Sequence, residues 1–219
     1  MKKGGKNKMI TFEEIKKINF PSDFGTYTGD LLDVPAELIN THTQFACGIT
    51  KLVIFLNDSE VVKVPFDGGL LDREDEDGED FYFFEIKDYC EREAYFYDEA
   101  VDAGVEEFFA KTELAGYADC GRPLYKSERV FEYMSEETLD IRSKEPSQKA
   151  KNSANDSDCG VLPFGWLARA YDYYGEEKVD KLIEFLDEFD IRDLHDGNIG
   201  FRKNGAPVLL DYSDYREDY

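Results

Sequence analysis

The stretch that decides the fold is Asp190-Ile-Arg-Asp-Leu-His-Asp-Gly-Asn-Ile-Gly200, followed by Leu209-Leu210-Asp211-Tyr212. Asp193 and Asn198 are five residues apart, and Asp211 follows Asn198 by 13 residues. Between them, Asn204-Gly205 is a turn signal that separates two apolar runs, so we expect a hairpin over 198–211. The hairpin would bring Asp211 back toward Asn198. Two carboxylates and one amide oxygen would then converge, and such hard oxygen ligands are typical of Mg²⁺ that carries nucleotide phosphates.

These residues resemble the catalytic loop and metal-binding segment of the protein-kinase-like superfamily, which includes enzymes that phosphorylate aminoglycosides and sugars. The family's loop has the order H-R-D-x-x-x-x-N, followed later by D-F-G. Arg192-Asp193 and Asn198 keep that order and spacing, with Ile191 in place of the first histidine. Asp211-Tyr212-Ser213 stands in the position of D-F-G. The resemblance implies an α+β fold with two lobes, a β-rich N-lobe and a minimal helical C-lobe.

The resemblance also implies a role for each residue in an ATP-dependent phosphotransferase. Asp193 would accept the proton of the acceptor hydroxyl or orient it, and Asn198 and Asp211 would hold Mg²⁺. His195 is given no catalytic role. Each residue has a structural alternative, because Asp193 and Asn198 are ordinary turn formers and Asp211 lies in an acidic tail. Their joint order and spacing favour the functional interpretation.

The upstream chain contains a candidate for the lysine that such a fold requires. Residues 51–56 and 61–64 are rich in β-branched and aromatic side chains and flank turn residues at 57–59, which predicts a hairpin. Lys63 lies on the second strand, where the resemblance implies that it would pair with the α- and β-phosphates of ATP. A solubilising charge on an edge strand is the structural alternative for Lys63.

The segment 46–51 stands in the position of the family's glycine-rich loop. It has one glycine, Gly48, where that loop has three, so fewer bare backbone amides would face the phosphates. Lys51 or the hydroxyl of Thr50 would compensate. We therefore assign Gly48, Thr50, Lys51 and Lys63 to the nucleotide site.

A helix is predicted over 86–103, with Gly104 as its stop. Spacings of three and four residues place Cys90, Glu93 and Tyr97 on one face of it. Glu93 is the candidate acid that would orient Lys63, and Glu91 is the alternative. A solvated helix acid is the structural interpretation of Glu93.

A strand over 124–131 would lead into a hinge at 132–134, where backbone groups of Glu132 and Met134 would bind adenine. Two helices follow, over 163–174 and 176–189, and the second carries an apolar stripe. The second helix would precede the catalytic loop.

Four segments are expected from these assignments: a tail and short helix over 1–19, the N-lobe over 20–134, a flexible linker over 135–160 and the C-lobe over 161–219. The linker is expected because residues 142–158 are almost free of apolar side chains. The C-lobe is expected to be truncated, because the sequence ends eight residues after Asp211. A missing substrate platform disfavours classical peptide phosphorylation, leaves a pseudokinase open and fits a phage or mobile-element protein.

The chain has 219 residues, with 26 basic and 49 acidic side chains and a net charge of −23. This charge argues against direct contact with nucleic acid or an anionic membrane surface. No apolar run is long enough to span a bilayer. The four cysteines are scattered without a CxxC pair, which favours reduced thiols in the cytoplasm.

An acidic run at 72–80 is expected as a solvated loop. Over 72–107, 16 acidic and 3 basic side chains give a local net charge of −13. The alternative function is therefore a non-enzymatic protein that uses this surface to imitate DNA or to occupy the basic groove of a partner. The phosphoryl acceptor of the enzyme hypothesis, a small molecule or a protein, is not specified by the sequence.

Overall fold

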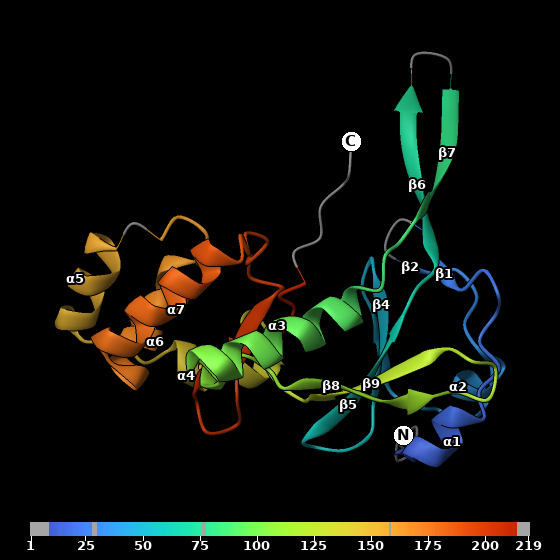
Figure 1. Cartoon of the computed structure of the whole chain (residues 1–219), viewed down its shortest axis with the longest axis horizontal. Coiled ribbons are helices and arrows are strands. Elements are labelled where there is room, and N and C mark those ends of the chain that lie inside the picture. Colours follow the sequence, from blue (N-terminus) through green and yellow to red (C-terminus); the bar gives the residue numbers. More distant parts are fainter. Residues whose placement is uncertain (1–8, 28–29, 76–77, 158, 214–219) are drawn as a thin grey trace, which may run out of the picture. The chain divides into compact units, whose positions relative to one another are not determined.

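The computed structural model describes residues 9–27, 30–75, 78–157 and 159–213, with the backbone alone over 71–84. The chain is a mixed α+β protein, as expected (Figure 1). It divides into two compact units, Met1–Arg92 with Thr112–Glu128, and Glu93–Lys111 with Arg129–Tyr219. The expected N-lobe, residues 20–134, differs from this division. Residues 93–111 and 129–134, which were expected in the N-lobe, belong to the second unit.

The first unit contains a five-stranded antiparallel sheet in the order β3-β4-β5-β9-β8. The strands are β3 (Phe45–Cys47), β4 (Lys51–Phe55), β5 (Glu60–Pro65), β8 (Thr112–Tyr117) and β9 (Pro123–Glu128). The predicted hairpin over 51–64 is confirmed as β4–β5. Leu52, Ile54, Val62 and Val64 alternate toward one face and form a buried core with residues of α1 (Phe12–Lys16) and α2 (Ala36–Asn40).

A second sheet of this unit has the order β2-β1-β6-β7. Its strands are β1 (Gly25–Tyr27), β2 (Asp30–Leu31), β6 (Gly68–Asp75) and β7 (Gly78–Glu85). The predicted loop over 72–80 is wrong, because most of this run continues the β6–β7 hairpin. Aromatic residues at 81–84 have high β propensity, and their pairing with residues 69–72 extends the ladder into the acidic run.

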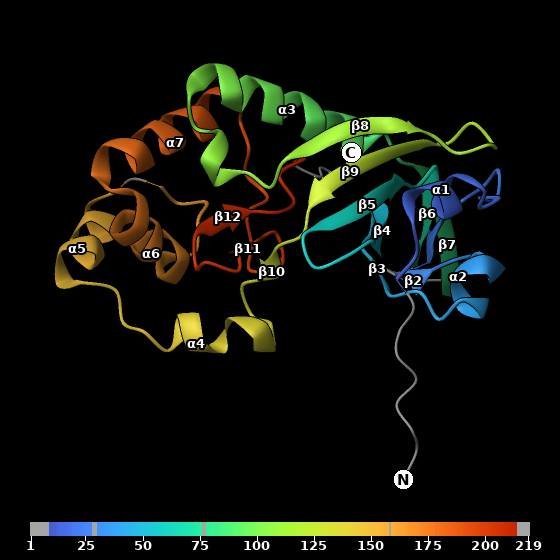
Figure 2. The same ribbon diagram turned by 90° about the horizontal axis from the view of Figure 1, so that it is seen from below.

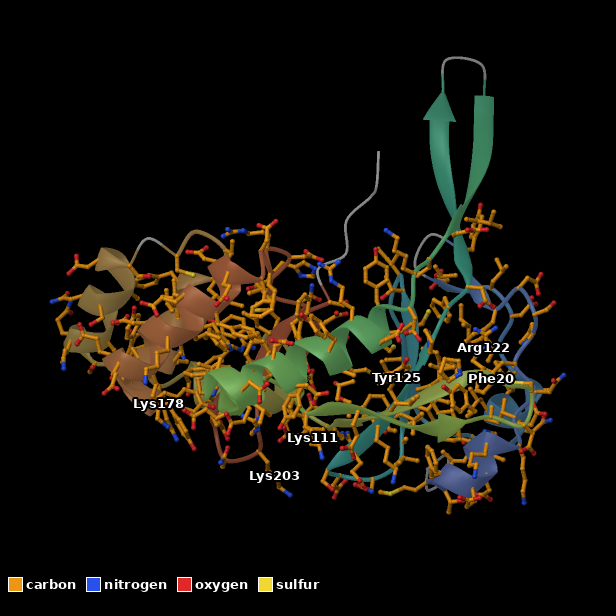
Figure 3. All side chains as sticks on the ribbon, in the orientation of Figure 1. Phe20, Lys111, Arg122, Tyr125, Lys178 and Lys203 are labelled. Atoms are coloured by element: carbon orange, nitrogen blue, oxygen red, sulfur yellow. The ribbon has the colours of Figure 1, made fainter. Side chains whose placement is uncertain are left out.

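Arg122 holds three distant segments of the first unit together (Figure 3). Its guanidinium donates to the carbonyl oxygens of Pro65 at 3.1 Å and Pro21 at 3.0 Å. It also pairs with the carboxylate of Asp67 and lies 5.1 Å above the ring centre of Phe24. A single planar cation thus fixes the N-terminal segment against β5 and β9.

Helix α3 spans Tyr89–Ala103, three residues shorter at its start than predicted. Asp88 explains the start, since its carboxylate accepts a hydrogen bond from the Glu91 amide at 3.0 Å. Gly104 ends the helix in the left-handed region, with φ of 71°, as predicted.

The second unit is built around helices α6 (Phe164–Tyr174) and α7 (Glu176–Glu188), which pack with a small sheet (Figure 2). The sheet has the order β10 (Phe131–Glu132), β11 (Ile199–Phe201) and β12 (Pro207–Leu209). Both predicted helices and the hairpin over 198–211 are confirmed. Gly205 closes the hairpin turn with φ of +88°. The predicted strand over 124–131 is divided, since β9 ends at Glu128 and β10 begins at Phe131.

The flexible linker predicted over 135–160 is wrong. This segment contains η2 (Glu136–Thr138), α4 (Leu139–Arg142) and α5 (Gln148–Asp156). Ser147 caps α5 by accepting from the Ala150 amide at 3.2 Å, and it also binds Asp172 on α6. Ala150 and Ala154 are buried one turn apart, so α5 packs through small side chains that give no strong apolar signal in the sequence. In the described part of the chain, no helix has the length and apolar character needed to cross a membrane.

Candidate functional site

The predicted site residues fall into two groups, one in each unit, and each group is described by itself. The first unit holds Gly48, Thr50, Lys51 and Lys63. The second unit holds Glu93, Glu132, Met134, Asp193, Asn198 and Asp211.

Asp193 and Asn198 are joined in the loop that follows α7. The side-chain amide of Asn198 donates to the carbonyl oxygen of Asp193 at 2.7 Å. Its backbone amide donates to the carbonyl oxygen of His195 at 2.9 Å. Ile191 and Leu194 are buried and anchor the loop in the core. The Asp193 side chain is 36% exposed.

The hairpin brings Asp211 next to Asn198, as the sequence predicts. The carbonyl oxygen of Asn198 accepts hydrogen bonds from the amides of Leu210 at 2.9 Å and Asp211 at 3.2 Å. The hydroxyl of Ser213 donates to the Asp211 carboxylate at 2.9 Å. Asp193, Asn198 and Asp211 therefore form one cluster within the second unit.

Tyr212, the residue after Asp211, anchors this end of the hairpin in the core. Sequence analysis did not predict this role. The side chain of Tyr212 is fully buried, its hydroxyl donates to the carbonyl oxygen of Ala110 at 2.8 Å, and its ring centre is 4.9 Å from that of Phe109. The available signal was its place directly after Asp211, where the resembling family has the phenylalanine of D-F-G.

His195 lies beside Asp193. Its Nδ1 accepts a hydrogen bond from the Gly197 amide at 3.0 Å, so the proton of the neutral ring is carried by Nε2. Nε2 is 3.8 Å from the Asp193 carboxylate. His195 therefore borders the Asp193 carboxylate, a contact that sequence analysis did not predict.

The predicted hinge residues border the same hairpin. Glu132 pairs with Gly200 across β10–β11, and the Tyr133 amide donates to Ile199 at 2.9 Å. The carbonyl oxygen of Glu132 accepts from the Ser135 amide at 3.1 Å. Met134 is 59% exposed, whereas Tyr133 is half-buried.

In the first unit, the sheet register places Lys51 and Lys63 on one face. Lys63 lies opposite Val53 on β4, and Val53 shares its face with Lys51. Lys51 is 3% and Lys63 5% exposed. Thr50, just before β4, is also buried, whereas Gly48 is exposed.

Glu93 is fully buried on α3, whereas Glu91 is exposed. Cys90 of the predicted face is also buried, and Tyr97 is half-buried. Burial distinguishes Glu93 from the alternative, since an acid is rarely buried without a partner.

Asn198 and Asp211, whose backbones are hydrogen-bonded to each other, each carry a side-chain oxygen of the kind that Mg²⁺ prefers. Among the described residues, no group of three or more histidine, cysteine, aspartate or glutamate side chains is placed to hold a metal. Mg²⁺ does not require one, because it is commonly bound through one or two carboxylates, water and substrate phosphates. The residues present therefore fit Mg²⁺ that arrives with a nucleotide.

The surface proposed for an acidic interaction protein lies partly outside the described side chains. The side chains of residues 71–84, which include the acidic run at 72–80, are outside the described part of the structure.

Comparison of the chain with protein-family models, curated proteins and solved structures found no match in any of the three.

Proposed function

We propose that the chain is an ATP- and Mg²⁺-dependent phosphotransferase of kinase-like fold that acts on a hydroxyl acceptor, either a small molecule or a protein. The observation that carries this proposal is the double use of Asn198. Its side chain binds Asp193, and its carbonyl oxygen binds the Asp211 backbone. This connects the candidate base and the two candidate metal ligands in one unit.

The order of elements supports the proposal. Lys63 lies on β5, the third strand along the chain of the five-stranded sheet, as the lysine of protein kinases lies on their third strand. The helix that follows carries the buried Glu93, and α7 leads into the loop of Asp193. The two compact units would then correspond to the two lobes. The β6–β7 hairpin would be an insertion between β5, which carries Lys63, and α3.

Each side chain has a chemical task in this proposal. When bound, Mg²⁺ would supply positive charge that offsets the negative charge of the phosphates. Asn198 would present its amide oxygen and Asp211 its carboxylate, which Ser213 orients. Asp193 would accept the proton of the acceptor hydroxyl, and its partial exposure leaves the carboxylate within reach of an acceptor.

The nucleotide would be held by the remaining residues. Lys63 would neutralise phosphate charge, with Glu93 as its orienting partner. The carbonyl of Glu132 and the amide of Tyr133 are bonded within the unit, so the backbone of Met134 is our candidate for binding adenine. The four cysteines are free thiols, which supports a reducing compartment such as the cytoplasm.

The test is a thermal-shift measurement with ATP, with and without Mg²⁺, on the wild type and Asp211→Ala. A ligand at about 100 times its Kd stabilises the folded state by roughly 2.7 kcal/mol. We expect a Mg²⁺-dependent rise that Asp211→Ala loses. Asp196→Ala is the matched control, because Asp196 is an exposed aspartate of the same loop. No shift at millimolar MgATP would contradict the proposal and favour an acidic interaction protein, whereas binding without phosphoryl transfer would indicate a pseudokinase.

A further inference from the structure

A pocket of about 210 Å³ lies in the second unit, apart from the residues proposed for phosphoryl transfer. It is lined by the segment that joins α4 to α5, by helix α6 and by Gly205 in the turn of the β11–β12 hairpin. Asn198 and Asp211 flank the other end of that hairpin, beyond the pair Ile199–Leu209. The pocket and the candidate catalytic cluster are therefore separate places in the same unit.

The segment beside the pocket is basic in a strongly acidic chain. Residues 142–151 carry four basic side chains and one acidic side chain, a net charge of +3, whereas the whole chain carries −23. Lys144 lines the pocket and is exposed. Within the described part of the chain, its ammonium group makes no ion pair or hydrogen bond. Lys144 is thus available to an anion that enters the pocket.

Arg169, on α6, supplies a second cation to the pocket. Its guanidinium donates to the carbonyl oxygens of Gly165 at 2.7 Å, Arg142 at 2.6 Å and Lys144 at 3.1 Å. These acceptors are neutral, and among the described residues no carboxylate lies within ion-pair distance of the guanidinium. The charge of Arg169 is therefore held in place by the backbone without being neutralised.

The Nε atom of Arg169 is also left without an acceptor. It is buried, and no hydrogen-bond partner for it is found among the described residues. Buried polar groups in folded proteins almost always have a partner, so an unsatisfied donor on a pocket-lining side chain indicates an acceptor that comes from outside the chain.

The two acids that line the pocket are already bound to other groups. Glu145 pairs with Lys151 at 2.5 Å, and this contact lowers the pKa of the Glu145 carboxyl. The carboxylate of Asp172 accepts hydrogen bonds from the Ser147 amide at 2.7 Å and the Ser147 hydroxyl at 2.5 Å. With Lys151, three cations stand against two carboxylates here. An incoming anion therefore meets a local excess of positive charge.

The rest of the pocket is apolar or aromatic. Ile141 and Pro146 are half-buried, and the ring of Tyr173 packs edge-on against Tyr174 with the ring centres 4.8 Å apart. The Tyr173 hydroxyl accepts a hydrogen bond from the side chain of Asn204 at 3.3 Å, which holds the ring beside the hairpin turn. An engineered cavity of about 150 Å³ holds benzene, so this pocket has room for one ring and one anionic group.

We propose that this pocket binds a small aromatic molecule that carries one phosphate or carboxylate group. The anion lies between Lys144 and Arg169, and the ring packs against Tyr173. A guanidinium matches two oxygens of either anion, and an anion that draws Arg169 toward it also provides the acceptor that Nε lacks. This binding needs neither Mg²⁺ nor nucleotide, so the inference goes beyond the proposed phosphotransferase function and does not depend on it.

The first experiment titrates the wild type, without nucleotide or Mg²⁺, with four compounds and follows the backbone amide resonances by NMR. Phenyl phosphate and benzoate combine a ring with an anion, whereas inorganic phosphate and phenol each lack one of the two. We expect saturable shifts for residues 141–146 and 169–173 with phenyl phosphate or benzoate, and the stronger of the two identifies the anion. Phosphate and phenol are expected to bind at least fivefold more weakly.

The second experiment compares Lys144→Met with Lys149→Met. Lys149 is a matched control, because it belongs to the same basic segment, is 86% exposed and pairs with Glu176 at 3.8 Å without lining this pocket. Lys144→Met is expected to weaken the stronger ligand at least fivefold, and Lys149→Met less than twofold. Equal weakening by the two variants would mean that the segment attracts anions in general, and it would refute the pocket as a binding site.

A measurement on the wild type tests Arg169, whose replacement would remove three hydrogen bonds to the backbone. The ¹⁵N–¹H signal of Arg169 Nε is expected to shift on saturation with the stronger ligand. The Nε signal of Arg122, which is also buried without a described partner but belongs to a guanidinium paired with Asp67, is expected to stay in place. An unmoved Arg169 signal at saturation, or no saturable binding of either ring-bearing anion at millimolar concentration, overturns the proposal.

Discussion

Tyr212 donates its hydroxyl to the carbonyl oxygen of Ala110 at 2.8 Å, across 102 residues of sequence. The bond is buried and lies directly after Asp211, so it ties the end of the β11–β12 hairpin to the segment that follows η1 (Glu106–Phe108). The position of a candidate metal ligand therefore depends on a contact that is remote in the chain.

Tyr212→Phe removes the donor of this buried hydrogen bond. A typical hydrogen bond contributes about 0.5–1.5 kcal/mol, so we expect the free energy of unfolding to fall by that amount in urea titration. Tyr173→Phe is the control, since Tyr173 is half exposed, and it is expected to change stability by less than about 0.5 kcal/mol. Equal effects of the two variants would show that the buried bond contributes nothing specific.

Gly200→Ala tests the close approach of β10 to β11. A Cβ atom at residue 200 would lie 2.1 Å from the Phe131 carbonyl oxygen, so one strand must shift. Overpacking of this kind costs about 1–3 kcal/mol, and we expect a lower melting temperature together with weaker nucleotide binding. Gly160→Ala meets no atom within 4 Å and is expected to leave both unchanged. A stable Gly200→Ala variant would mean that β10 can move without loss.

Asp193→Asn separates binding from proton transfer. The backbone carbonyl that Asn198 binds is kept, and so is the shape of the side chain, while the proton acceptor is lost. We expect MgATP to stabilise the variant as it does the wild type, and the rate of phosphoryl transfer to fall by about 10²–10⁴-fold. The measurement pairs a thermal shift with single-turnover kinetics. Full turnover by the variant would exclude Asp193 as the base.

His195→Gln examines the neighbour of Asp193. The variant removes the ring nitrogen that accepts a hydrogen bond from the Gly197 amide at 3.0 Å. A typical hydrogen bond contributes about 0.5–1.5 kcal/mol, so we expect the free energy of unfolding to fall by no more than that, with little change in MgATP affinity. A large loss of MgATP affinity in the variant would show that His195 does more than hold the loop.

Tyr174 gives the stability of the second unit a dependence on alkaline pH. Burial raises the pKa of its hydroxyl to about 12, from about 10 in an unfolded chain. The folded state thus holds this proton more tightly, so the contribution is complete below pH 10 and is lost as the pH rises toward 12. We expect the wild type to lose stability faster than Tyr174→Phe in urea titrations between pH 9 and about 11.

The control for this pH effect is Tyr173→Phe, which changes the half-exposed neighbouring residue and keeps the Tyr174 hydroxyl. The alkaline loss of stability is expected to persist in this variant. Parallel curves for Tyr174→Phe and the wild type would remove Tyr174 as the source of the alkaline loss.

Local signals in the sequence predicted much of the second unit. These signals reflect contacts between residues close in the chain. They are the Asn204-Gly205 turn, the apolar stripe on α7 and the spacing of Asp193, Asn198 and Asp211. The β4–β5 hairpin follows from the same kind of pattern, whereas the α+β class was implied by the family resemblance. These features were predictable because turn chemistry and side-chain periodicity act over a few residues.

The rest depended on contacts between distant segments. Ala150 and Ala154 form one face of α5 only because α6 is present to receive them, and the acidic run extends a strand because its partner strand is aromatic. The bond of Tyr212 to Ala110 joins residues 102 positions apart and has no signature in a local pattern.

The contacts of Arg122 determine when the first unit can complete its folding during synthesis. Pro21 emerges 101 residues before Arg122, and at about 5–20 residues per second roughly 5 to 20 s separate them during synthesis. Throughout that interval Phe20 and Phe24, both buried in the finished unit, lack the cation that packs against the N-terminal segment. We expect nascent chains shorter than about 122 residues to expose these rings and to be held by chaperones, and release to coincide with the emergence of β9.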